Sequence, residues 1–135
     1  MAVAGTVTTT TTDLGRGYTE YSMAWLCSAG GAVTENAVPF PRGHIHQVEF
    51  IPDGGGTAPT AAYDVTLIDA ITGGVDFLTG IGADLSATAR KIGVPQVGDG
   101  TTALQRVFFG GGNLYPTVAN AGNAKGGTIV VVMGP

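Results

Sequence analysis

Residues 18–28 alternate between large apolar side chains and small or polar ones, and this alternation constrains the fold more than any other feature. Tyr21, Met23, Trp25 and Cys27 fall on one face of an extended segment. A period of two is typical of a β-strand with one buried face. The pattern therefore predicts a strand whose large side chains enter a core.

Further extended segments recur along the chain, separated by turns rich in glycine and proline. We expect them over residues 6–12, 44–51, 62–70, 104–109, 114–120 and 128–133, with a polar loop over 96–102. In the 44–51 strand we place His46, Val48 and Phe50 on one face, opposite Gln47 and Glu49.

One segment departs from the pattern of strands. Residues 75–88 have apolar side chains three or four apart, which predicts a short helical turn. Gly80 and Gly82 disfavour a longer helix, because each costs about 1 kcal/mol relative to alanine.

About seven or eight short strands with turns between them predict an all-β, single-domain β-sandwich of the jelly-roll type. The length of 135 residues fits one domain. We expect residues 1–14 to form an extended N-terminal arm or an edge strand. Residues 15–135 form the sandwich.

The composition excludes several classes of protein. The apolar fraction of 44% is too high for a disordered chain, and the net charge of −4 disfavours nucleic-acid binding, which needs clustered lysine and arginine. No apolar run approaches about 18 residues, and the start lacks the features of a secretory signal, so we expect no membrane partner. Cys27, the single cysteine, is expected to be a buried thiol in a chain made in the cytoplasm.

The chemistry-bearing residues form no recognisable catalytic motif. His44 and His46 are candidate metal ligands, but a site needs a third ligand, and the chain has two histidines. The acidic residues are spread along the chain, and we expect Asp76 and Asp84 to cap turns. The sequence therefore predicts no enzyme, no cofactor and no assigned metal.

Two segments indicate contacts with other chains. Phe108 and Phe109 cannot both face one side of a strand, and residues 129–133 are apolar on both faces. A second subunit is one way to cover the outward side chains; a bulge or a covering loop is the alternative. The predicted interaction residues are Val3, Val7, Thr9, Thr11, Phe109, Val130 and Val132.

Segments 63–69, 74–88 and 118–131 resemble small virion structural proteins of tailed bacteriophages, some of which are capsid decoration, or cement, proteins. The similarity covers roughly residues 62–133, and its most specific part is Asn-Ala-Gly-Asn-Ala-Lys at 120–125. It implies a β-fold module, often a homotrimer, that sits on capsomer junctions and contacts the major capsid protein. The expected location is the capsid surface of the virion, after synthesis in the host cytoplasm.

Three functions follow from these observations. The first is a capsid decoration protein, possessing contact surface rather than a reactive pocket. The second is a carbohydrate- or receptor-binding β-sandwich of a phage tail or fibre, which predicts aromatic side chains exposed on one face, whereas the alternation around Trp25 predicts burial. The third is a metal-dependent, cupin-like enzyme built on His44 and His46. The first is the function we expect.

Overall fold

The computed structural model describes residues 4–98 and 104–135. Nearly all of its regular structure is β-strand, with one 3-10 turn among the described residues. The elements are β1 (Thr6–Gly15), β2 (Tyr18–Leu26), β3 (Val38–Phe40), β4 (Gly43–Pro52), the 3-10 turn η1 (Gly55–Thr57), β5 (Asp64–Ile68), β6 (Lys91–Gly93), β7 (Gln96–Gly98), β8 (Leu104–Arg106), β9 (Phe108–Phe109), β10 (Gly112–Ala119) and β11 (Gly126–Gly134).

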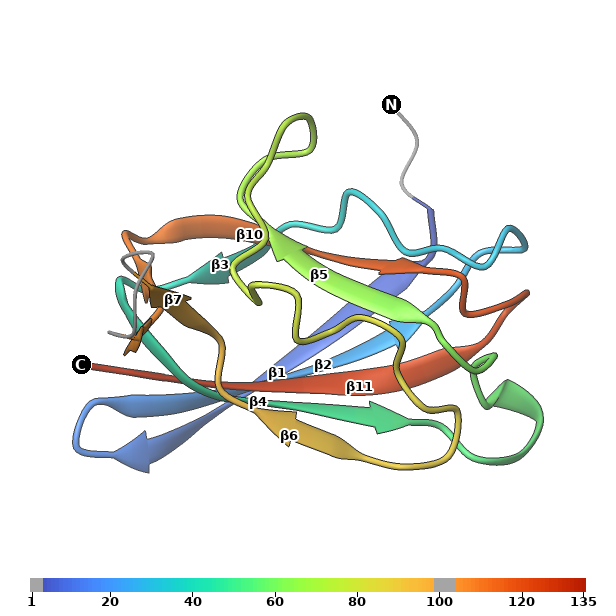
Figure 1. Ribbon diagram of the computed structural model, residues 1–135, viewed down its shortest axis with the longest axis horizontal. Helices are drawn as coiled ribbons and strands as arrows, with labels where there is room; N and C mark the ends of the chain where they lie inside the picture. The colour runs from blue at the N-terminus through green and yellow to red at the C-terminus, as the bar shows by residue number, and fades with distance from the viewer. Residues whose placement is uncertain (1–3, 99–103) are drawn as a thin grey trace.

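The strands form two main layers (Figure 1). The larger sheet has the order β1-β2-β11-β4-β6, with β9 also paired to β4, and the smaller sheet has the order β3-β10-β5. All of these pairs are antiparallel. The predicted all-β sandwich is confirmed. The order β2-β11-β4-β6 facing β3-β10-β5 is that of a jelly roll, with the turns of residues 69–88 in place of an eighth strand.

The core lies between the layers and receives the face of β2 predicted from the sequence. Met23, Trp25 and Cys27 are buried there, and the Trp25 ring lies 5.5 Å from the ring of Tyr63 on the opposite side. Gly127 on β11 permits this packing, because a Cβ at that position would come within 2.7 Å of the Trp25 ring. A bulkier residue would displace the indole.

At the N-terminal end of β4, the prediction of which side chains face the core is wrong. Val48 and Phe50 are buried as expected, but Ile45, and not His46, is the next residue to enter the core. The register with β11 shifts between Val132 and Met133, so β4 carries an extra residue at this point. A β-bulge of one residue reverses which side chains face inward, and strict alternation does not reveal it.

The helical turn expected within residues 75–88 does not form, and the one short helical turn among the described residues is at Gly55–Thr57. Residues 76–83 form successive reverse turns, each closed by a backbone hydrogen bond between residues three apart. Thr79 and Gly80 both have positive φ angles, of 51° and 87°, which a right-handed helix cannot accommodate. The apolar side chains Leu78 and Leu85 still reach the core from these turns.

The segment 96–109 also differs from the prediction. Gln96–Gly98, expected in a loop, pairs antiparallel with Leu104–Arg106, and residues 99–102 of that predicted loop lie outside the described residues. The single strand expected over 104–109 is divided at Val107 into β8 and β9. Val107 is buried, and its carbonyl accepts a hydrogen bond from Ile45, so the chain changes partner at this residue.

The N-terminal segment is an edge strand and not a detached arm. β1 pairs with β2 from Thr6 opposite Leu26 to Asp13 opposite Thr19. Gly15 pairs with Tyr18, and the two turn residues between them, Arg16 and Gly17, both have positive φ, as a tight hairpin turn requires. The blue β1–β2 hairpin projects at one end of the molecule in Figure 1.

Candidate interaction surface

The outer face of the larger sheet is built from short side chains on four neighbouring strands. Cross-strand register places Thr10, Ser22 and Val130 in one row, and Thr8, Ala24 and Thr128 in the next. Directly opposed residues in antiparallel strands share a face, so these rows form one continuous surface. We call this surface the sheet face; it comprises Thr8, Thr10, Thr12, Glu20, Ser22, Ala24, Gln47, Glu49, Ile51, Thr128, Val130 and Val132.

The sheet face has few charged side chains. Of its two carboxylates, Glu49 is only 9% exposed and forms an ion pair with Arg90, the single salt bridge found among the described residues. Glu20 stands at one margin, opposite Thr12 and Val132. A surface of this composition can approach another protein without burying an unpaired charge at its centre.

Short side chains also make the sheet face suited to binding. Threonine, serine, alanine and valine lose less rotamer entropy on ordering than lysine or glutamate do. Two apolar side chains extend the face at its margins: Leu26 at the end of β2, 45% exposed, and Ile92 on β6, 60% exposed. The side chains of this surface would therefore lose little entropy on binding, and its rim offers apolar area for a partner to cover.

The structure distributes the predicted interaction residues over three environments. Val130 and Val132 lie half-buried on the sheet face. Thr9 and Thr11 are exposed on the opposite side of β1, because the three-stranded sheet does not cover this edge strand. Val7 packs against the core, and Val3 lies outside the described residues.

Phe108 and Phe109 face opposite sides of β9, as the sequence requires, but the outward residue is Phe108 and not Phe109. Phe109 is 6% exposed and packs on Phe77, whereas Phe108 is 51% exposed. Phe109, the predicted interaction residue, is therefore a core residue, and Phe108 is the ring exposed to solvent. Sequence alternation shows that the two must diverge, but only the pairing of β9 with β4 determines which one turns inward.

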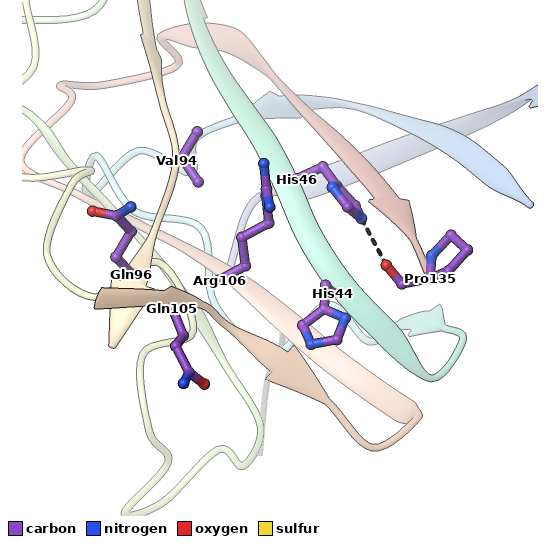
Figure 2. A pocket seen from close by; sticks show the side chains of 7 residues that line it. All are labelled: His44, His46, Val94, Gln96, Gln105, Arg106 and Pro135. Carbon is purple, nitrogen blue, oxygen red and sulfur yellow. Dashed lines mark hydrogen bonds between the residues drawn. The ribbon is translucent and has the colours of Figure 1, made fainter. Parts of the chain in front are cut away.

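His44 and His46 line a pocket of about 490 Å³ with Val94, Gln96, Gln105, Arg106 and Pro135 (Figure 2). The imidazole centroids lie 6.4 Å apart, and Nε2 of His46 is 3.1 Å from the carbonyl oxygen of Pro135. The His46 ring also packs edge-on against Tyr18. Within the described part of the chain, no three histidine, cysteine, aspartate or glutamate side chains gather as a metal set.

Several aspartate side chains organise turns by accepting hydrogen bonds from backbone N–H groups. Asp76 accepts hydrogen bonds from the backbone N–H groups of Leu67, Leu78 and Gly80, so its predicted turn-capping role is confirmed. At Asp84, by contrast, the backbone N–H donates to the carboxylate of Asp64. Asp64 and Asp69, which were not predicted as turn anchors, each accept from one backbone N–H, that of Asp84 and that of Val75 respectively.

The single thiol is placed for packing rather than for chemistry. Cys27 is buried at the end of the inward row of β2, as predicted. Burial raises the pKa of the Cys27 thiol, which disfavours the nucleophilic thiolate. Its backbone N–H donates to the carbonyl of Lys125 and ties β2 to the loop before β11.

Comparisons of the chain with protein-family models, curated proteins and solved structures found no match. No helix in the described residues is long and apolar enough to span a membrane. The structure offers three candidate contact features: the sheet face, the edge strand β1 and the pocket beside His44.

Proposed function

We propose that this protein is a non-enzymatic virion structural protein of a tailed bacteriophage, which binds and stabilises the assembled capsid as a decoration protein. The observation that carries the proposal is the sheet face, a continuous surface across four paired strands whose one buried carboxylate, Glu49, is paired with Arg90. The resemblance of residues 62–133 to phage virion proteins supplies the kind of partner, the major capsid protein. The protein acts on the capsid surface after synthesis in the host cytoplasm.

The physical requirements of a decoration protein agree with this surface. Such a protein works through contact area repeated over a symmetric shell, so each contact can be weak while many copies together stabilise the particle. Its backbone must stay rigid on binding, and here the half-buried Val130 and Val132 lie on β11, which is paired on both sides. The resemblance further implies a homotrimer, which a mass measurement of the purified protein tests.

A pair of single substitutions tests the proposal. Val130→Lys places a cation at the centre of the sheet face, whereas Val75→Lys places the same charge at a turn residue that is 63% exposed and not part of the sheet face. Each purified variant, with its fold checked by circular dichroism, is added to capsids of the phage that encodes the chain, assembled without it. Occupancy is counted by electron cryomicroscopy and shell stability by thermal melting.

We expect wild type and Val75→Lys to bind and to raise the melting temperature of the shell, and Val130→Lys to lose most of its occupancy. Failure of the wild-type protein to bind these capsids would overturn the proposed function. Equal occupancy of both variants would show that the sheet face is not the attachment surface.

A second candidate function is a carbohydrate- or receptor-binding module of a phage tail or fibre. The observation that favours it is the pocket lined by two imidazoles, two carboxamides and the Arg106 guanidinium, groups that can hydrogen-bond to sugar hydroxyls. Trp25, the natural stacking platform, is buried, and the exposed aromatic Phe108 lines a neighbouring groove. Binding to surface glycans of the host cell, with no binding to capsids, would select this function instead.

A further inference from the structure

The outward edge of β1 is a long row of backbone groups without a partner strand among the described residues. β1 spans ten residues, Thr6–Gly15, and pairs only with β2. In an antiparallel ladder every second residue directs its N–H and C=O away from the neighbour, so half of the strand presents free donors and acceptors. Such an edge is a template for another strand.

The chain protects its other sheet edges in the usual ways. β6 has three residues and begins at Lys91, and β3 has three residues with a proline at its centre. β5 is longer, but the turns beside it satisfy its outer edge: Gly82 accepts from Val65, and Leu67 accepts from Phe77. Shortness, charge, proline and covering loops are the devices that keep edges from pairing.

β1 has none of these devices along most of its length. Six of its residues are threonine, a β-branched residue that favours extended structure, and the strand contains no lysine and no proline. The register irregularity with β2 comes only at its end, between Asp13 and Gly15. The contrast with the protected edges indicates that β1 is kept open for pairing.

We propose that β1 pairs with β1 of a second copy of this chain, in antiparallel orientation about a two-fold axis near the middle of the strand. The charges select this partner and this direction. Asp13 is the only charged residue of β1, and with the axis near Thr10 it lies beside Val7 of the other copy, far from the second Asp13. A parallel pair in register would instead bring the two carboxylates together, which is unfavourable.

Threonines meet threonines across this interface, and threonine pairs are favourable cross-strand neighbours. A two-fold axis perpendicular to the sheet makes the contact self-complementary. This axis also leaves the sheet faces of the two copies on the same side of the dimer, where they form one continuous surface. This pairing does not depend on the proposed capsid role, and it differs from the homotrimer that the resemblance implies.

The first test is the mass of the protein in solution, measured by analytical ultracentrifugation over a range of concentrations. We expect a monomer–dimer equilibrium. Thr10→Lys places two cations beside the axis and should raise the dimer dissociation constant about tenfold or more. Thr10→Val keeps a β-branched, uncharged side chain and should leave it nearly unchanged, and Thr72→Lys adds the same charge at an exposed turn as a second control.

The second test is a cysteine scan at Thr8, Thr10 and Thr12, which project from one face of β1. In an antiparallel pair the distance between equivalent residues grows by about 6.8 Å for each residue away from the axis, which is twice the rise of a strand. Disulfide cross-linking should therefore be strong at one position and weak at the others. The buried Cys27 leaves the background low.

A dimer that is weakened by Thr10→Lys and cross-links at one position establishes the pairing. A monomer at all concentrations, a trimer, a dimer indifferent to Thr10→Lys, or equal cross-linking at all three positions overturns it. These results concern the edge of β1, whereas capsid binding by the sheet face is measured separately with Val130→Lys, at a position on β11 away from that edge.

Discussion

Removal of the Asp76 carboxylate should destabilise the protein more than removal of any other single acidic side chain of the turn region. Its Oδ1 accepts from Leu67 and Leu78 at 3.0 and 2.9 Å, and its Oδ2 accepts from Gly80 at 3.1 Å. A hydrogen bond to a charged group contributes about 1.5–3 kcal/mol when buried. Because this site is only partly buried, we assign about 1 kcal/mol to each bond, or about 3 kcal/mol for Asp76→Ala.

Two further variants separate hydrogen bonding from charge. Asp76→Asn keeps one acceptor oxygen but presents an amide to Gly80, so we expect a loss of about 1–2 kcal/mol. Asp69→Ala removes a single bond, from the Val75 N–H at 2.8 Å, and should cost about 1 kcal/mol.

The assay is urea unfolding, which reports the free energy of unfolding when the slope is unchanged between variants. The expected order of stability is wild type, then Asp69→Ala and Asp76→Asn close together, and then Asp76→Ala. If Asp76→Ala were no less stable than Asp69→Ala, the assignment of Asp76 as the anchor that joins β5 to the turns would be refuted.

Two other predictions concern the core. Val131→Ala removes a fully buried side chain of β11 and should cost about 2–3 kcal/mol, whereas Val130→Ala, one residue away on the sheet face, should cost less than about 1 kcal/mol; equal losses would contradict the assigned faces. Burial, with a smaller contribution from the charge of Asp53, raises the pKa of Tyr63 to about 12. Since the unfolded state loses this proton near pH 10, stability conferred by the neutral phenol should decline between pH 10 and 12, by up to about 2 kcal/mol. Tyr63→Phe should flatten that decline, and an equally steep decline in the variant would exclude Tyr63 as its source.

The parts of the fold that depend on local pattern could be predicted from the sequence. The alternation in β2 correctly placed Met23, Trp25 and Cys27 in the core, because an antiparallel strand with one buried face has a strict period of two. The all-β class followed from the number of such segments. Asp76 was also recognised as a turn residue, since its short carboxylate reaches backbone N–H groups close by in the chain.

The errors lie where contacts between distant segments decide the structure. The bulge at His46 arises from the register with β11, which no local alternation encodes. The spacing of Val75, Leu78, Ile81 and Leu85 suits a helix, but these side chains belong to turns fixed by hydrogen bonds to β5. The choice between arm and edge strand at β1, and between Phe108 and Phe109 as the outward ring, likewise needed the sheet order.

Only part of the candidate site could be predicted, because the rest of it depends on the register between strands that are distant in the sequence. Val130 and Val132 were predicted as contact residues because residues 129–133 are apolar on both faces, and the structure places both on the sheet face. The threonines at 8, 10 and 12 were missed, since only their register with Ala24, Ser22 and Glu20 shows that they share the face of Val130. The pairing of Glu49 with Arg90 joins residues 41 positions apart and has no sequence signature.

The most direct test of the proposed function is a structure of the purified phage particle, by electron cryomicroscopy at side-chain resolution. Our account predicts density for this chain on the outer surface of the capsid, with Val130 and Val132 facing the major capsid protein. Density on the tail, or on the capsid with the sheet face turned to solvent, would contradict it.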